Sequence, residues 1–161
     1  MAAAVAVIDG LAIERNLQRI KSAAPGCRVV AVVKANGYGH GLEYVAKLLS
    51  AADALAVARV GEGVRLRASG VRGPVLILEG CADGDEVRLA AEHELDIVVH
   101  DPTHFKLLEG LGKHNARRVW LKLDTGMGRL GFAPARLDAC LRRLRKLNGV
   151  RDDIVLMTHL A

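Results

Sequence analysis

The chain has 161 residues, of which 51% are hydrophobic and only 3% aromatic, and its formal net charge is +5. This length is enough for one domain with a hydrophobic core, and no apolar run is long enough to predict a membrane-spanning helix. The basic residues are scattered without interleaved aromatics, so nucleic-acid binding is not expected. Three well-separated cysteines favour free thiols in a reducing cytosol over a disulfide framework, and we therefore expect a cytoplasmic protein.

Apolar strands alternate with helical patterns in the first half of the chain. Residues 5–8 predict a short strand, and Asp9 predicts the N-cap of a helix that ends at Pro25. Small and β-branched residues fill positions 29–33, as in a strand buried on both faces. The elements expected next are a helix around 42–49, a strand at 54–58, a helix at 62–69 and a strand at 75–78.

The same alternation continues to the end of the chain. Asp83, with Glu86 three residues later, resembles a capping box and predicts a helix start. His100 and His104 lie four residues apart, but His100 precedes the predicted helix cap at Asp101, so a helix start is favoured over a metal-binding pair. The remaining predicted elements are strands at 97–99, 119–123 and 154–157, with helices after Asp101 and from Pro134 to Asn148.

Strands and helices that alternate in this way predict a parallel sheet, either a barrel or a doubly wound fold. An eight-stranded barrel typically needs about 250 residues. Six strands follow the first predicted helix, so we expect an α/β fold of the (β/α)8 TIM type, truncated after about six strands.

Lys34 stands where the strand at 29–33 ends, and a glycine-rich loop follows it. A lysine at the carboxyl end of a barrel strand is placed for chemistry, because active sites of such barrels form there. A neutral lysine amine can attack an aldehyde to form a Schiff base, and burial favours the neutral form. The alternative is a lysine that only extends its ammonium group from the end of the strand into solvent.

The segment 32–41, Val-Val-Lys-Ala-Asn-Gly-Tyr-Gly-His-Gly, resembles the lysine segment of alanine racemases, which use pyridoxal 5'-phosphate (PLP). The resemblance implies that Lys34 holds PLP as a Schiff base and acts as the base on one face of the substrate. It also implies that Tyr38 hydrogen-bonds the PLP phosphate. His40 is expected to steady the loop. Leu-Glu-Gly at 78–80 favours the proteobacterial catabolic type of the family.

A second informative segment, 121–132, contains a Gly-x-Gly-x-x-Gly pattern at 126–131. Dinucleotide-binding glycines normally follow the first strand of a fold, and these follow a late one, so this interpretation is weak. The segment resembles the part of alanine racemases in which one lysine is carbamylated and one arginine contacts cofactor and substrate. By position these are Lys122 and Arg129. The alternative for Lys122 is an ion pair with Asp124 inside the barrel.

The last segment, 157–161, resembles the end of the family's sixth strand, where a histidine lies beside the cofactor ring; this implies that role for His159. The resemblance implies an isomerase that interconverts L- and D-alanine for peptidoglycan synthesis, acting as a homodimer with no metal. A tyrosine from the partner subunit's C-terminal domain would serve the other face of the substrate.

The resemblance covers residues 1–161 as part of the N-terminal PLP-binding barrel domain, without the last two strands and without the C-terminal β domain. We therefore expect weak or no racemisation by this chain alone. The alternative function is a non-catalytic PLP-binding barrel of the PLP-homeostasis type, which lacks a second domain. The short length favours this alternative, and the segments around Lys34 and Arg129 favour the racemase.

Overall fold

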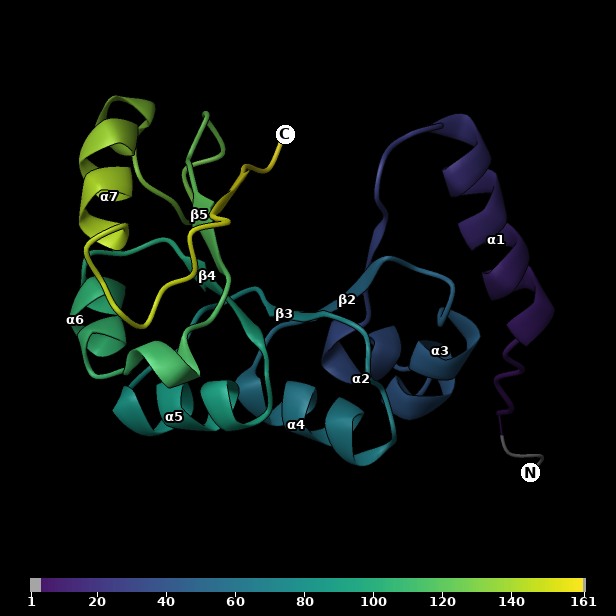
Figure 1. Ribbon diagram of the computed structural model, residues 1–161. Coiled ribbons are helices and arrows are strands. Elements are labelled where there is room, and N and C mark those ends of the chain that lie inside the picture. Colours follow the sequence, from purple (N-terminus) through teal and green to yellow (C-terminus); the bar gives the residue numbers. More distant parts are fainter. Residues whose placement is uncertain (1–3, 161) are drawn as a thin grey trace.

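Six parallel strands form one curled sheet in the computed structural model, which describes residues 4–160 (Figure 1). The strands pair in chain order, so each βα unit lies beside the next. Figure 1 shows the helices along the outer side of the curve. This arrangement confirms the predicted barrel truncated after six strands. The strands are β1 (Val30–Val32), β2 (Ala54–Val57), β3 (Val75–Ile77), β4 (Asp96–Val99), β5 (Val119–Lys122) and β6 (Val155–Met157).

Two of the helices begin at aspartate caps that the sequence marks. The Asp9 carboxylate accepts a hydrogen bond from the Ala12 N–H at 3.0 Å, and Asp83 accepts one from the Glu86 N–H at 2.9 Å. Within residues 4–160, no helix is long and apolar enough to cross a bilayer. The helices are α1 (Gly10–Ala23), α2 (Lys34–Tyr38), α3 (Leu42–Leu48), α4 (Val60–Ala68), α5 (Gly84–Glu92), α6 (Thr103–Glu109) and α7 (Leu137–Leu144), with short 3-10 turns η1 (Lys113–Asn115) and η2 (Pro134–Arg136).

The hydrophobic core lies between the sheet and the helices. Alternate side chains of each strand point outward into it, including Ile77, Ile97 and Leu121, which are all fully buried. The intervening side chains form a smaller cluster on the inner face of the sheet, built on Ala56, Leu76 and Val98. Because both faces of the central strands are covered, these strands consist almost entirely of apolar residues, as the sequence pattern predicts.

The predicted strand at 5–8 is wrong. These residues form neither helix nor strand, and Val5 and Val7 are 82% and 86% exposed. Figure 1 shows this end of the chain below α1, away from the sheet. An apolar segment forms a strand only where a neighbouring strand can satisfy its backbone hydrogen bonds, and among residues 4–160 no strand pairs with residues 5–8.

Candidate active site

A cavity of about 810 Å³ opens at the carboxyl ends of the strands. All six strands contribute to its wall, because parallel strands end at the same edge of the sheet. Residues at or just beyond those ends line it, namely Lys34, Ala58, Leu78, His100, Lys122 and Thr158. Catalytic groups of α/β barrels gather at this edge.

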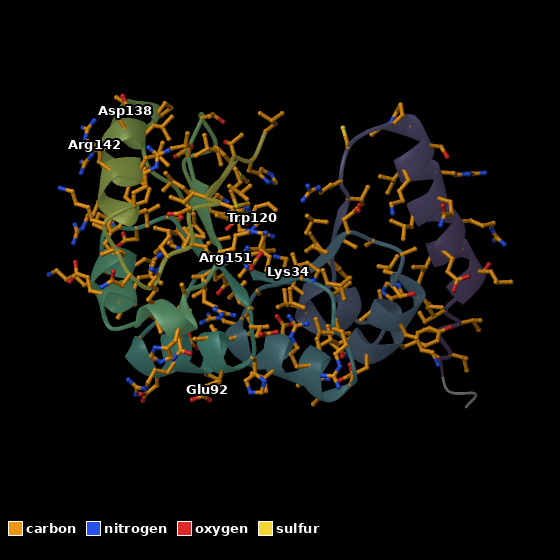
Figure 2. All side chains as sticks on the ribbon, in the orientation of Figure 1. Lys34, Glu92, Trp120, Asp138, Arg142 and Arg151 are labelled. Atoms are coloured by element: carbon orange, nitrogen blue, oxygen red, sulfur yellow. The ribbon has the colours of Figure 1, made fainter. Side chains whose placement is uncertain are left out.

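The five residues singled out from the sequence all line this one cavity. They come from three segments that are far apart in the chain and lie at the ends of β1, β5 and β6. Figure 2 shows Lys34 near the middle of the molecule, far from Asp138 and Arg142 on α7. The five residues are Lys34, Tyr38, Lys122, Arg129 and His159.

Directly after Lys34 the backbone makes a left-handed turn, which lies within the segment labelled α2. The φ angles are +53° at Ala35, +55° at Asn36, +63° at Gly37 and +54° at Tyr38. Left-handed backbone costs roughly 1–2 kcal/mol for each residue that carries a Cβ, and three of these four do. Strain of this kind persists only where surrounding contacts hold it, and it gathers at functional sites.

Hydrogen bonds hold this turn, so it is not the loose glycine loop that the sequence suggests. The Gly37 N–H donates to the Val33 carbonyl at 2.9 Å, and the Gly41 N–H donates to the Asn36 carbonyl at 2.9 Å. The Asn36 side chain accepts from the Leu42 N–H at 3.1 Å, at the start of α3. The turn is therefore fastened at both ends and to the helix that follows.

His40 steadies the turn, as expected. Its Nδ1 lies 3.0 Å from the Gly37 carbonyl oxygen and 3.1 Å from that of Tyr38, so this nitrogen carries the proton and donates. Tyr38 itself is 59% exposed, and its ring borders the cavity. The phenol is thus free to donate a hydrogen bond to a bound molecule.

The turn is also tied to the neighbouring βα unit by Glu62, in the first turn of α4. One carboxylate oxygen accepts from the Ala35 N–H at 2.7 Å. The other accepts from the N–H groups of Ala58 and Arg59, at 2.9 and 3.3 Å. In the sequence, Glu62 marks only the beginning of a helix, because a contact with a residue 27 positions away leaves no local signal.

The loop that carries Arg129 is shaped by a carboxylate and a glycine. Asp124 accepts from the N–H groups of Gly126 and Gly128, both at 3.0 Å, and these bonds hold the pKa of its carboxyl below the usual value. Gly131 has a φ of +129°, and a Cβ there would lie 2.6 Å from the Asp124 nitrogen. Only glycine fits this close approach of two backbone segments.

Lys122 is a buried cation at the end of β5, with 8% of its surface exposed. Burial lowers the pKa of its amine, and the nearby positive charge of Arg129 lowers that pKa further. The alternative ion pair with Asp124 does not form: within residues 4–160 no carboxylate lies within 4.0 Å of the amine, and Asp124 instead organises the glycine loop. The charge of Asp124 opposes the lowering of this pKa without pairing directly with the amine. Burial of a lysine without a direct ion pair is costly, and its neutral form is reactive.

His159 lies just beyond β6 and is exposed at the cavity. The preceding residue fixes the path of this segment, because the Thr158 hydroxyl donates to the Leu123 carbonyl at 2.9 Å and shares a hydrogen bond of 2.7 Å with Thr125. The ends of β5 and β6 are thereby joined. Neither threonine was singled out from the sequence, since pairing of two strand ends is a tertiary contact.

A second, smaller cavity of about 380 Å³ adjoins the first and shares Glu79, His100, Arg129 and Leu130 with it. The His100 side chain contacts the Glu79 carbonyl through Nε2 at 2.9 Å, and its backbone N–H donates to Nδ1 of His104 at 3.3 Å. These contacts agree with a helix start rather than a metal pair. Within residues 4–160, no three metal-binding side chains come together.

The Gly-x-Gly-x-x-Gly pattern does not form a dinucleotide site. After the last glycine, Gly131, the chain pairs with the end of β5, because the Phe132 N–H donates to the Lys122 carbonyl at 2.9 Å. The first helical residues begin only at Pro134. A dinucleotide site needs the glycines directly at a helix N-terminus, where backbone N–H groups meet the pyrophosphate.

These features define a class of protein: part of a parallel (β/α) barrel with a lysine-containing site at the carboxyl ends of its strands. Residues 8–161 match the family model described as "Alanine racemase, N-terminal domain". The chain therefore belongs to the alanine racemase N-terminal domain family.

Individual relatives agree with this membership. The chain is 47% identical to an alanine racemase of Nitrosococcus oceani over 97% of this chain and 44% of the relative. It is 42% identical to the biosynthetic alanine racemase of Escherichia coli K12 over 100% of this chain and 45% of the relative. The crystal structure of the biosynthetic alanine racemase from Pseudomonas aeruginosa superposes with a TM-score of 0.85 at 41% identity, over 94% of this chain and 42% of that one.

The chain thus spans less than half the length of these relatives. The family and the fold agree with the resemblance found in the sequence. The catabolic type favoured by residues 78–80 stays a prediction.

Proposed function

We propose that the site acts in the PLP-dependent interconversion of L- and D-alanine. The observation that supports this most directly is that Lys34, Tyr38, Lys122, Arg129 and His159 line a single cavity at the strand ends. The five residues come from segments that resemble the family's cofactor and substrate segments, and a shared cavity is what that resemblance predicts.

The residues around the cavity fit PLP. A volume of about 810 Å³ lies within the usual range for small-molecule sites. Arg129 supplies positive charge for an anionic cofactor, and Tyr38 supplies a phenol that can donate to a phosphate. Leu78, Leu130 and Met157 supply apolar wall for a ring.

Lys34 would hold the cofactor through its Nζ. When bound, PLP serves as an electron sink that stabilises negative charge at the substrate Cα. A neutral Lys34 amine, once released from the cofactor, can accept the Cα proton or return it on its own side of the cavity. The left-handed turn limits the motion of Lys34, and fixed geometry of this kind favours proton transfer.

Arg129 would bind the substrate carboxylate, because its planar guanidinium can donate two parallel hydrogen bonds to a carboxylate. Lys122 would be carbamylated: its neutral amine adds to carbon dioxide, forms a C–N bond and loses one proton to solvent. The product is an anion that would pair with Arg129 and remove the unfavourable juxtaposition of two cations. Isotope-labelled carbon dioxide would then give a carbamate NMR signal that Lys122→Met removes.

The proposal covers only one face of the substrate, because the chain spans about 44% of the length of its N. oceani relative. In the whole protein, a homodimer would supply a tyrosine for the second face from the partner subunit's C-terminal domain. We propose a cytoplasmic setting and a role in making D-alanine for peptidoglycan. By itself, the chain would racemise alanine slowly or not at all.

Reduction of the PLP-treated chain with borohydride tests the central assignment, because it fixes the cofactor permanently to the amine that holds it. Peptide mass spectrometry should find the label on Lys34. Lys34→Ala should lose it, whereas Lys47→Ala, at an exposed site on α3, should keep it. Label absent from Lys34 at saturating PLP would contradict the proposal.

Formation of D-alanine from L-alanine separates the two candidate functions. The racemase predicts D-alanine above the cofactor-only rate when the same site is present in a chain that includes the C-terminal domain. A labelled Lys34 without any D-alanine in that longer protein would favour the PLP-homeostasis barrel instead.

A further inference from the structure

We propose that Glu62 is the positioning residue for Lys34. Its carboxylate holds the left-handed turn that directs the Lys34 side chain into the cavity. This inference rests on the proposed function only in taking Lys34 as the amine that holds the cofactor.

The two oxygens of Glu62 serve different strands. Oε1 accepts from the Ala35 N–H at 2.7 Å, at the residue directly after Lys34. Oε2 accepts from the Ala58 N–H at 2.9 Å, just beyond β2, and from the Arg59 N–H at 3.3 Å. The Glu62 side chain therefore joins the ends of β1 and β2, and the residues just beyond these two strands, Lys34 and Ala58, line the cavity.

At the end of the sheet, the Glu62 carboxylate replaces a backbone carbonyl as hydrogen-bond acceptor. The Val33 N–H donates to the Ala56 carbonyl at 2.8 Å, as in a continuing parallel ladder. Two residues further, the same ladder would join the Ala35 N–H to the Ala58 carbonyl. Instead, the Ala35 N–H donates to Glu62, and the Ala58 carbonyl accepts from the Glu79 N–H at 3.2 Å. The chain after β1 is thus released from the sheet and can turn directly after Lys34.

The next βα unit shows which part of this arrangement is ordinary. Glu86, in the first turn of α5, accepts from the N–H of Ala82, four residues earlier, at 2.8 Å. Glu62 makes the same contact with Ala58, also four residues earlier. That bond secures the entry into a helix. The bond to Ala35 has no counterpart at Glu86, so it serves the turn after Lys34 rather than the helix.

Glu62→Gln, with Glu86→Gln as the matched control, separates the two roles. A glutamine has only one acceptor oxygen. Turning its NH2 group toward Ala58 and Arg59 would lose two bonds, whereas turning it toward Ala35 loses one, so the bond to Ala35 is the one expected to be lost. Because the lost bond is assisted by charge, fixation of PLP to Lys34 by borohydride should slow by about tenfold in Glu62→Gln. Glu86→Gln should stay within about threefold of the wild type by the same estimate.

Three further readouts distinguish positioning from general loss of structure. Far-ultraviolet circular dichroism should be alike in the two variants, because neither substitution removes a helix or a strand. The ratio of label on Lys34 to label on the exposed Lys47 should fall only in Glu62→Gln. In the cofactor-free wild type, the amide of Ala35 should be protected from hydrogen exchange although the residue is exposed, and Glu62→Gln should remove that protection.

Wild-type labelling rates in Glu62→Gln, or equal losses in both variants, would overturn the inference. An unprotected Ala35 amide in the wild type would overturn it as well, and this measurement does not require the variant to fold. If the wild type takes no label at Lys34, the proposed function fails, while the exchange of the Ala35 amide still decides whether Glu62 holds the turn.

Discussion

His104, in α6, should make the stability of this chain depend on pH in mild acid. Only 7% of the residue is exposed, and burial lowers the pKa of the imidazole from 6.5 to about 4. The neighbouring His100 lowers this pKa further, and Asp101 opposes the shift. The unfolded chain therefore takes up a proton near pH 6.5, whereas the folded chain takes it up only near pH 4. The stability that neutral His104 contributes is fully present above pH 6.5 and is lost as the pH falls from 6.5 to about 4.

The gap between the two pKa values sets the size of the effect. From 6.5 to about 4, at about 1.4 kcal/mol for each pH unit, the full loss is about 3 kcal/mol. The ring borders the smaller cavity, and access of solvent through it reduces the expected loss to about 2 kcal/mol. For a chain of this size, that is a large part of the free energy of unfolding.

His104→Asn removes the titration and keeps an acceptor for the His100 N–H, which now donates to Nδ1 at 3.3 Å. Urea unfolding between pH 7.5 and pH 4 should show a smaller loss of stability in this variant than in the wild type. His114→Asn, at an exposed position in η1, is the control and should follow the wild type. The same loss in wild type and His104→Asn would refute the argument from burial.

Three other substitutions test the strain and the buried charge. Gly131→Ala would force a Cβ to within 2.6 Å of the Asp124 nitrogen, so urea unfolding should show a loss of roughly 2 kcal/mol or more. Ala35→Gly relieves roughly 1–2 kcal/mol of left-handed strain and loses about 0.4–1 kcal/mol through the freer unfolded chain, so a net gain of about 0–1.6 kcal/mol should appear. Burial raises the pKa of the Asp96 carboxyl, and the Trp120 indole N–H that donates to it at 3.2 Å opposes the shift. Stability therefore falls as the pH rises through the folded pKa of Asp96, because the buried carboxyl becomes charged. Asp96→Asn should have a higher melting temperature than the wild type at pH 7 and the same melting temperature in acid. An unchanged melting temperature at pH 7 would count against a raised pKa of Asp96.

The order of the strands and helices could be predicted from the sequence because their causes are local. Asp9 and Asp83 mark helix starts through bonds to residues three positions away, and runs such as 75–78 are apolar throughout because both faces of the sheet are covered. The strand predicted at 5–8 failed for the opposite reason. Its apolar residues meet the local requirement, but no neighbouring strand is present to pair with them.

The residues of the site were found in the same way, as unusual side chains directly after predicted strands. Lys34 and Lys122 stand where apolar runs end, and Arg129 lies among glycines. The resemblance to a family assigned their roles. The residues that hold these segments in place could not be predicted. Glu62 contacts Ala35, which lies 27 positions away, and Thr158 contacts Thr125, which lies 33 positions away.

The sequence by itself determined the alternation of strands and helices, the strand ends at which the chemistry-bearing side chains stand, and the family. Only the tertiary structure decided that these ends face one cavity, that the segment after Lys34 is a hydrogen-bonded left-handed turn, and that Lys122 is buried beside another cation. The physical reason is the range of the forces involved. Periodicity and capping act within a few residues, whereas burial, charge pairing and the support of strained backbone depend on groups that only folding brings together.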